Sequence, residues 1–370
     1  MKLQGIERAW RAVWMHAIAR ALPGRRLEAV PDWSGREWRV LFLRYERIGD
    51  MIMSTGVIRV IAQSQPTIKV DVLANPTALP VLENNPHVNR SLALNRGSIR
   101  SYRRTMKQVR AEHYDVVVDG RLNNPPIFTS TPLIMLASRA RYRVGVGGGN
   151  NDLIYNLRAA RYDRSTHYVE GSKELGIPFG VDPGSVDWQP EIFLSAVESE
   201  AADEQWRGAA SLAAPGNAKR LLVNLSASEP KRRWPDGKFK AVLKSVRASN
   251  PAMPVAVIGL PKEWESVSSV ANSVGALAVP TPRLRDALAL LGRADIVFTP
   301  DTSISHAASA FRKPSLVLLK REHRPYAPYN TPGRVLLWSE NEIAELPYER
   351  VLSELNSVLA QYGVGDRIPE

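Results

Sequence analysis

The chain has 370 residues, and its length predicts two domains of ordinary size. The composition, with 44% hydrophobic and 23% charged residues, excludes a disordered chain, and the absence of cysteine excludes disulfides, thiolate metal sites and cysteine nucleophiles. The net charge of +12 favours an anionic partner such as nucleic acid, phospholipid headgroups or a phosphorylated substrate.

Residues 1–30 predict a basic amphipathic helix. Apolar residues, among them Trp10 and Trp14, recur at helical spacing over residues 6–22, and arginines occupy other positions. Charges within the apolar pattern argue against a cleaved signal peptide, and no uninterrupted apolar run is long enough to span a bilayer. Two interpretations stay open: the helix contacts an anionic membrane surface, or its tryptophan face packs on its own domain.

From residue 38 the chain alternates short β-rich runs with longer helical stretches. The expected strands are 39–45, 68–74, 115–119 and 142–146, followed by 220–226, 254–260, 295–299 and 315–319. Continuous apolar runs separated by helices are typical of parallel strands that are covered on both faces. We therefore expect an α/β fold with two doubly wound, Rossmann-like domains facing across a cleft, with ligands at the carboxyl ends of the strands.

The same pattern sets the expected domain boundaries. The N-terminal domain is expected over residues 38–185 and the C-terminal domain over 190–340, with a stretch that contains Pro and Gly between them. Residues 341–370 are expected to form a closing helix, over about 341–361, and a tail.

A short polar segment follows the first predicted strand. Arg47-Ile48-Gly49-Asp50 leads into an apolar helix, and Gly49 permits a tight turn between strand and helix. Asp50 then lies near a helix N-terminus. It either satisfies free N–H groups there as a cap or serves as a general base, and this segment alone favours the cap.

Two later segments complete a recognisable pattern. Residues 223–235 read VNLSASEPKRRWP and residues 300–310 read PDTSISHAASA. Together with RIGD at 47–50, and in this order, they resemble bacterial glycosyltransferase family 9, the lipopolysaccharide heptosyltransferases. The resemblance covers about residues 38–345.

The resemblance implies a fold and an activity. The fold is GT-B-like, with the acceptor held by the first domain and the donor mainly by the second. The activity is inverting transfer of a heptose-like sugar from a nucleotide diphosphate, classically ADP-heptose, to lipopolysaccharide core or another surface glycan. The alternatives are a GT-B enzyme that uses another nucleotide sugar, or a degenerate, membrane-associated scaffold that binds glycans.

The resemblance also implies roles for single residues. Asp50 matches the family's proposed base. Metal-dependent transferases usually carry D-x-D, which is absent here, so we expect protein cations and helix N–H groups, without metal or cofactor, to neutralise the diphosphate. The expected donor-binding residues are Ser226, Lys231, Arg232, Glu263, Asp301, Thr302, Ser303, Ile304, Ser305 and His306. The alternatives are a solvated basic loop at 231–233 and a packed histidine at 306.

Basic residues of the first domain are the candidates for binding the acceptor. The run from Arg96 to Arg110 contains no acidic residue. A solvated helix face is the usual explanation, whereas the resemblance implies contact with phosphates or carboxylates of a lipid-linked acceptor. The expected acceptor-binding residues are Gly49, Arg100, Arg103, Arg104, Lys107 and Arg121. Nucleic acid is not expected, because the run lacks interleaved aromatic residues.

Several positions depart from the family pattern. Ser303 replaces the usual Gly, Gly56 stands where Pro is common, and Leu225-Ser226 replaces the usual residues after Asn224. These departures predict a divergent member whose donor sugar is open. Its expected location is the cytoplasm, peripheral to the inner membrane.

Overall fold

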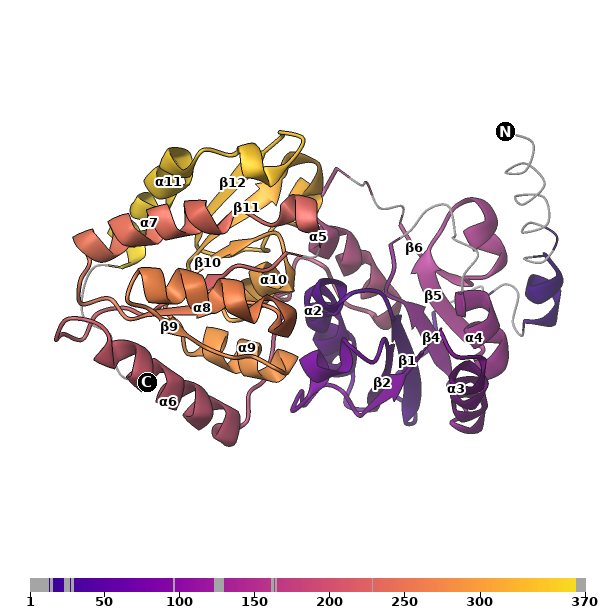
Figure 1. Ribbon diagram of the computed structural model, residues 1–370. Helices are drawn as coiled ribbons and strands as arrows, with labels where there is room; N and C mark the ends of the chain where they lie inside the picture. The colour runs from indigo at the N-terminus through magenta and orange to yellow at the C-terminus, as the bar shows by residue number, and fades with distance from the viewer. Residues whose placement is uncertain are drawn as a thin grey trace. The chain divides into compact units, whose positions relative to one another are not determined.

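The computed structural model describes residues 13, 16–22, 27, 30–95, 97–122, 130–160, 163, 165–227 and 229–363. The chain divides into two compact units, Met1–Pro190 and Glu191–Glu370. Each unit contains a six-stranded parallel sheet, in the order β3-β2-β1-β4-β5-β6 in the first unit and β12-β11-β10-β7-β8-β9 in the second (Figure 1). Both sheets follow the Rossmann order, so the prediction of two doubly wound α/β domains is confirmed.

The first unit contains strands and helices in alternation. Its strands are β1 Trp38–Arg44, β2 Ile68–Ala74, β3 Arg90–Ala93, β4 Val116–Asp119, β5 Tyr142–Val146 and β6 Leu157–Ala159, and its helices are α2 Ile48–Ser64, α3 Ile99–Ala111, α4 Ser130–Ser138 and α5 Tyr168–Ser172. Helix α2 packs on β1 and β2, while α3 and α4 pack against each other. Leu41 and Leu43 of β1 share a core cluster with Val109 of α3 and Ile134 of α4.

Part of the N-terminal segment joins this core. Residues 16–21 are helical, and Ile18 and Leu22 are buried in the same cluster as Leu41 and Leu43. This packing agrees with the interpretation that the helix covers its own domain. Trp10 and Trp14 lie outside the described residues. Within the described part of the chain, no helix is both long and apolar enough to cross a membrane.

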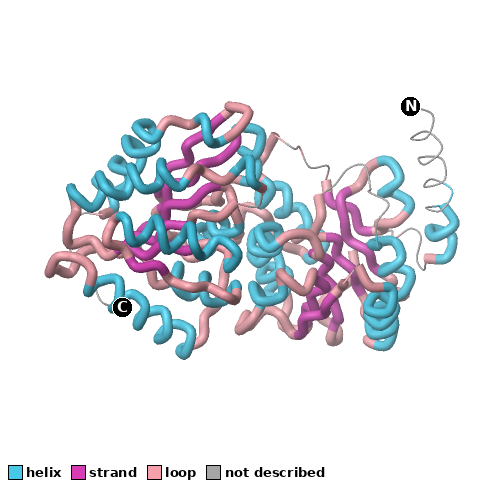
Figure 2. The backbone as a smooth tube through the Cα atoms, in the orientation of Figure 1, coloured by secondary structure: helices cyan, strands magenta, loops and turns pink. Residues whose placement is uncertain are grey.

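The second unit repeats the alternation. Its strands are β7 Leu221–Asn224, β8 Val255–Ile258, β9 Leu277–Ala278, β10 Ile296–Pro300, β11 Ser315–Lys320 and β12 Gly333–Trp338, and its helices are α6 Ala196–Ser211, α7 Asp236–Ser249, α8 Trp264–Ser273, α9 Leu284–Gly292, α10 Ser303–Ala310 and α11 Tyr348–Tyr362. Residues of α7, α8 and α11 share one core cluster with β7, β8 and β10. Helices α6 and α9 pack against each other, and α9 packs against α10 (Figure 2).

The edge strands were not predicted. β3, β6, β9 and β12 are short or only partly buried, unlike the central strands. A search for continuous apolar runs finds strands covered on both faces, and an edge strand need not be covered in this way.

The closing helix begins later than expected. A short 3₁₀ turn at Ile343–Glu345 precedes it, and α11 starts only at Tyr348, after Pro347. The residue before a proline is pushed out of the helical region, and Leu346 indeed has φ −62° and ψ 118°. The prediction of one helix from about 341 was therefore wrong at its start. Among the described residues, the main contacts of α11 are with α7, β10, β11 and β12 of its own unit.

Candidate active site

Asp50 lies in the first turn of α2, directly after the central strand β1. The helix begins after Arg47, so Asp50 is its third residue rather than its N-cap. One carboxylate oxygen, Oδ2, accepts the backbone N–H of Arg47 at 3.1 Å, while 22% of the side chain stays exposed. Asp50 is therefore not the N-cap that one interpretation predicted, although its contact with the Arg47 N–H does stabilise the helix start, and its carboxylate is still accessible to another molecule.

Arg44, the last residue of β1, holds Asp50 from the interior. Its guanidinium donates to Asp50 Oδ1 at 3.1 Å, to the Asp50 carbonyl at 3.2 Å and to the Gly120 carbonyl at 3.2 Å. Burial works against the charge of Arg44, yet Tyr168, Asp50 and Glu46 outweigh it and keep its pKa above the ordinary value. Arg44 thus joins the carboxyl ends of β1 and β4, the point where the order of the sheet reverses.

A second buried pair lies beside this one. Arg121 donates to Asp119 Oδ1 at 2.9 Å and Oδ2 at 2.7 Å, and Tyr155 donates to Asp119 Oδ2 at 2.6 Å. Burial acts against the Asp119 carboxylate, but Arg121 outweighs it, so the pKa of Asp119 is lowered. Glu46 lies near both arginines, 3.7 Å from Arg44 and 3.5 Å from Arg121, and burial nevertheless raises its pKa.

The candidates for acceptor binding fall into different environments. Arg100, Arg103, Arg104 and Lys107 are exposed on α3, and none of the four makes an ion pair among the described residues. Arg121, by contrast, is only 7% exposed, and its guanidinium donates hydrogen bonds to Asp119 and Thr131. Its contact with an acceptor therefore stays a prediction, and its observed role is internal.

Gly49 completes the predicted acceptor set, whereas Arg96 is only the first residue of the basic run. Gly49 is the second residue of α2, and it is not among the residues with positive φ. The expectation that the turn uses the special freedom of glycine is thus wrong for the backbone, because Gly49 is already helical. Arg96 lies outside the described residues.

In the second unit, Ser226 and Glu263 meet at the carboxyl ends of β7 and β8. Ser226 Oγ donates to Glu263 Oε2 at 2.7 Å, and it accepts the backbone N–H of Leu260 at 2.7 Å. Arg233 approaches the other oxygen of Glu263 at 3.4 Å. The structure therefore brings together these two predicted donor residues, which are separated by 37 positions in the sequence.

Asn224, the last residue of β7, connects this pair to the next strand. Its side-chain amide donates to Thr299 Oγ1 at 3.0 Å and to Thr302 Oγ1 at 3.3 Å, and its Oδ1 accepts the N–H of Ser226 at 3.2 Å. These bonds align the ends of β7 and β10. That is the reversal point of the second sheet, the place where α/β folds bind ligands.

The segment 301–306 forms the start of α10. Thr302 is the N-cap, and its hydroxyl accepts the N–H of Ile304 at 3.1 Å. Ser303, the first helical residue, needs no glycine freedom. Ile304, Ser305 and His306 are buried, and Ser305 Oγ donates to the carbonyl of Thr302 at 2.7 Å. Asp301, Thr302 and Ser303 are thus the more accessible part of this segment.

Asp301 meets two basic side chains. Its Oδ2 lies 2.7 Å from His323 Nδ1 and 3.6 Å from Arg232 Nη1. Arg232 belongs to the 3₁₀ turn η5, Pro230–Arg232, and His323 belongs to η7, Arg321–Tyr326. Lys231, the neighbour of Arg232, is exposed and makes no ion pair among the described residues. The buried Trp234, which donates from Nε1 to the Leu346 carbonyl at 3.2 Å, anchors this basic turn.

Sequence reasoning missed Arg44, Glu46, Asn224 and His323. Arg44 and Asn224 lie at the ends of predicted strands. Since ligands of α/β folds bind at the carboxyl ends of the strands, the sequence contained a usable signal for both residues. His323 carries a weaker form of this signal, since it lies four positions after the predicted strand 315–319, but nothing in the sequence pairs it with Asp301, 22 positions away. Among the described residues, no group of three or more His, Asp and Glu side chains is arranged to hold a metal ion.

Comparisons with known proteins identify the same glycosyltransferase family that the sequence motifs resemble, over most of the chain. The model of glycosyltransferase family 9 (heptosyltransferase) matches residues 102–354. Lipopolysaccharide heptosyltransferase 2 of Salmonella typhimurium is 23% identical over 88% of this chain and 100% of its own length. The lipopolysaccharide core heptosyltransferase OpsX of Haemophilus influenzae is 21% identical over 85% of this chain and 88% of its own.

Solved structures agree on the fold. A glycosyltransferase of family 9 from Veillonella parvula superimposes with a TM-score of 0.75 at 16% identity, over 90% of this chain and 99% of that one. The heptosyltransferase WaaC of E. coli, solved with ADP, has a TM-score of 0.66 at 17% identity, over 86% of this chain and 99% of that one. The expected GT-B-like architecture is therefore confirmed.

Proposed function

The chain belongs to glycosyltransferase family 9, the heptosyltransferases, and on this premise we propose that it transfers a heptose-like sugar from a nucleotide diphosphate to a lipopolysaccharide core acceptor, with inversion and without a metal ion. The observation that carries the proposal is the accessible Asp50 carboxylate, held by Arg44 at the reversal point of the first sheet. Both curated relatives named above are heptosyltransferases of lipopolysaccharide.

The second unit is the proposed donor site. Nucleotide diphosphates carry negative charge, and the start of α10 offers backbone N–H groups while Arg232 and Lys231 offer positive charge. Glu263 is positioned by Ser226 and Leu260 at the neighbouring strand end, where a carboxylate suits the hydroxyls of a ribose. ADP is the expected nucleotide, since a WaaC structure of similar fold contains ADP.

The first unit supplies the proposed base. In an inverting transfer, the acceptor hydroxyl attacks the anomeric carbon in line with the departing diphosphate, and a base removes the hydroxyl proton. Asp50 accepts one backbone N–H on Oδ2 and one guanidinium N–H on Oδ1, which leaves lone pairs for a substrate hydroxyl. The exposed cations of α3 are the proposed contacts for the anionic acceptor.

The test is the isosteric variant Asp50→Asn. The amide oxygen still accepts the N–H of Arg47, so the helix start is preserved, but the amide cannot take a proton and its NH₂ group faces the Arg44 guanidinium in place of a carboxylate oxygen. We expect the rate of heptose transfer from ADP-heptose to fall by about 10²- to 10⁴-fold, the usual contribution of a general base. Calorimetry should show unchanged ADP binding, and thermal unfolding measures separately the cost of the lost contact with Arg44, so activity per folded molecule should fall far more than stability.

Two outcomes would count against the proposal. Transfer that stays within tenfold of the wild type would remove Asp50 as the base. A large loss of stability with proportional loss of activity would instead assign Asp50 to helix capping alone. Titrations with ADP, UDP, GDP and CDP separate the donors, and tight binding of a nucleotide other than ADP would redirect the proposal to another sugar.

A further inference from the structure

His323 lies in a position that no sequence motif predicted. It sits in η7, and its ring contacts two different elements: Nδ1 lies 2.7 Å from Asp301 Oδ2, and Nε2 lies 3.4 Å from Arg232 Nη2. All three side chains are partly exposed, 23% for His323, 12% for Asp301 and 18% for Arg232. The group is therefore positioned by the protein and still accessible to a ligand.

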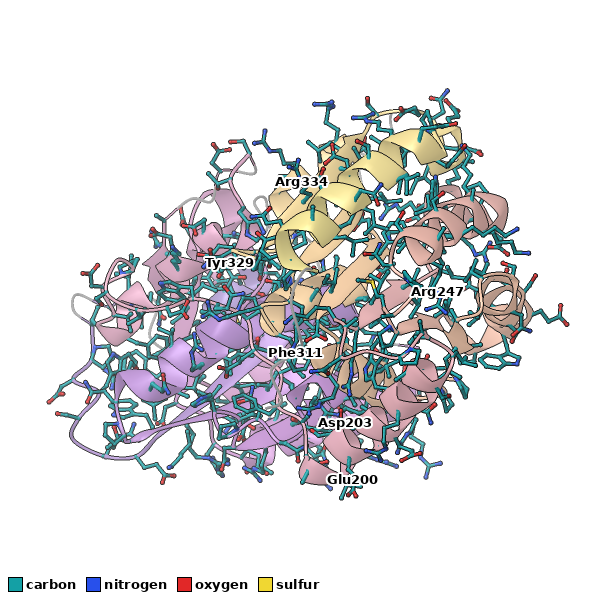
Figure 3. The ribbon with its side chains drawn as sticks, turned by 90° about the vertical axis from the view of Figure 1, so that its left-hand side faces the viewer. Glu200, Asp203, Arg247, Phe311, Tyr329 and Arg334 are labelled. Carbon is teal, nitrogen blue, oxygen red and sulfur yellow. The ribbon has the colours of Figure 1, made fainter. Side chains whose placement is uncertain are left out.

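The fold brings these residues together for a simple reason. Asp301 follows β10 and η7 follows β11, and the two strands are parallel neighbours, so their carboxyl ends share one edge of the sheet. The far end of the η7 loop is also tied to α10, because Ser309 Oγ donates to the Tyr329 carbonyl at 2.6 Å. Figure 3 labels Tyr329 and Phe311, the C-cap residue that follows α10.

Asp301 determines how the ring is oriented. An ionised carboxylate only accepts hydrogen bonds, so Nδ1 carries the hydrogen, and Nε2 is turned toward the guanidinium of Arg232. In the neutral ring, the lone pair of Nε2 faces an N–H donor. In the charged ring, two donors would face each other with no acceptor between them.

An anionic oxygen supplies the missing acceptor. A charge-assisted hydrogen bond joins nitrogen and oxygen at about 2.8 Å, so one oxygen can lie at this distance from both nitrogens, beside the 3.4 Å line that joins them, once a small rotation of the two side chains turns their N–H groups toward it. The oxygen then accepts from the imidazolium and from the guanidinium. Both are charge-assisted hydrogen bonds, the stronger kind.

We propose that His323 is a diphosphate-binding residue: together with Arg232 it holds an oxygen of the nucleoside diphosphate, and it takes up a proton from solvent when the diphosphate binds. The inference rests on the proposed function, since it concerns the same donor site. The proton adds to Nε2 of the neutral ring, and no covalent bond of the ligand changes. The added positive charge also balances the negative charge that grows on the diphosphate as the sugar leaves.

Other charged groups around the ring are consistent with this assignment. Glu322, on the same turn, lies 3.9 Å from Nε2, but it is engaged at 2.7 Å by Lys320. Glu229 on the other side contacts Arg232 at 3.4 Å. Asp301 is thus the acid that directly contacts the ring, and its oxygen is on the Nδ1 side, away from the proposed oxygen position.

The test measures proton uptake directly. ADP is titrated into the whole chain by calorimetry near pH 7.5 in two buffers with different enthalpies of ionisation, so that the difference in heat reports the protons taken up on binding. We expect the wild type to take up a fraction of a proton, at most one, per ADP bound. His323→Gln keeps an amide donor near Nε2 but cannot gain a proton, so it should bind ADP roughly tenfold more weakly and without this uptake.

The control and a second variant keep the result interpretable. His113→Gln removes an exposed histidine of the first unit and should retain the uptake. If His323→Gln folds poorly, His323→Asn replaces it and should likewise bind ADP more weakly and without proton uptake. ADP binding by the wild type without proton uptake, or uptake that persists in His323→Gln, would overturn the role of His323 while leaving the donor site in place. Failure of the wild type to bind ADP, UDP, GDP or CDP would overturn the proposed function as well.

Discussion

Arg44 shows how a single buried cation prepares the candidate base. It is 4% exposed and contacts the carboxylate and the carbonyl of Asp50 as well as the carbonyl of Gly120. The neighbouring Tyr168, whose pKa burial raises to about 12, remains neutral, and its ring packs against the guanidinium at 4.6 Å. We infer that Arg44 is a positioning residue that holds the Asp50 carboxylate in its orientation.

At the residue scale this predicts a graded response to substitution. Arg44→Gln should lower kcat for heptose transfer by at least tenfold, while the dissociation constant for ADP stays unchanged. Arg44→Lys should recover part of the loss, because an ammonium group keeps the charge but not the planar set of donors. Steady-state kinetics and calorimetry on the same preparations provide the measurement.

The control for this prediction is another buried arginine of the same unit. Arg143 donates to backbone carbonyls at Ile154 and Ala140, and it contacts neither Asp50 nor Asp119 in the interactions described. Arg143→Gln should reduce thermal stability while kcat per folded molecule is retained. If both arginine variants lost kcat equally, Arg44 would be merely structural.

At the scale of elements, an ion pair joins helices α6 and α9. Ser195 caps α6 with Glu198 as its capping-box partner, and the buried Arg285 of α9 donates to both oxygens of Glu198 at 2.6 Å. These bonds, first of all those from Arg285, lower the pKa of Glu198 to about 2. Because this pKa is depressed, the stabilisation is present above the ordinary value of 4.5 and is lost as the pH falls toward 2.

Glu198→Gln should therefore destabilise the protein in a pH-dependent way. At pH 7 we expect a loss of the order of 3 kcal/mol in the free energy of unfolding of the second unit, which corresponds to the pKa difference. The difference in the free energy of unfolding between the variant and the wild type should disappear as the pH approaches 2. Urea unfolding at several pH values checks this. Glu204→Gln is the matched control, since Glu204 on the same helix is 69% exposed and pairs with an exposed arginine, so little change is expected.

Close packing between elements also explains one departure from the family pattern. A Cβ at Gly56 in α2 would lie 2.3 Å from the Trp188 carbonyl oxygen, so the helix approaches residues 188–189 through this glycine. Arg59, one turn further, donates to the carbonyls of Asp187 and Gln189. In this chain, glycine at 56 serves the contact between α2 and the last segment of the first unit.

At the scale of the whole molecule, the surplus of positive charge is concentrated in part on one helix. The basic residues of α3 are exposed and lack carboxylate partners among the described residues, whereas Arg44, Arg121 and Arg143 are buried. Exposed, unpaired cations act on anionic ligands over a distance set by salt. The net charge of +12 thus includes the exposed surface of α3 that we proposed as the contact for the acceptor.

Removal of two of these charges tests that assignment. Arg103→Gln combined with Arg104→Gln should raise KM for the lipopolysaccharide acceptor several-fold and weaken its dependence on salt, with stability and ADP binding unchanged. Lys240→Gln combined with Lys244→Gln removes the same charge from α7 of the second unit and should leave KM as it was. Equal effects of the two pairs would show that only net charge matters.

The sequence by itself determined the α/β class, the central strands, the family and most of the candidate donor residues. These rest on local signals, because continuous apolar runs predict strands covered on both faces and short motifs follow their carboxyl ends. Only the tertiary structure decided that Arg121 is internal, that α11 starts after Pro347, that Arg44 holds Asp50, and that His323 meets Asp301 and Arg232. The physical reason is that burial and partnership of charged side chains depend on which strand ends become neighbours, and that neighbourhood exists only in the folded sheet.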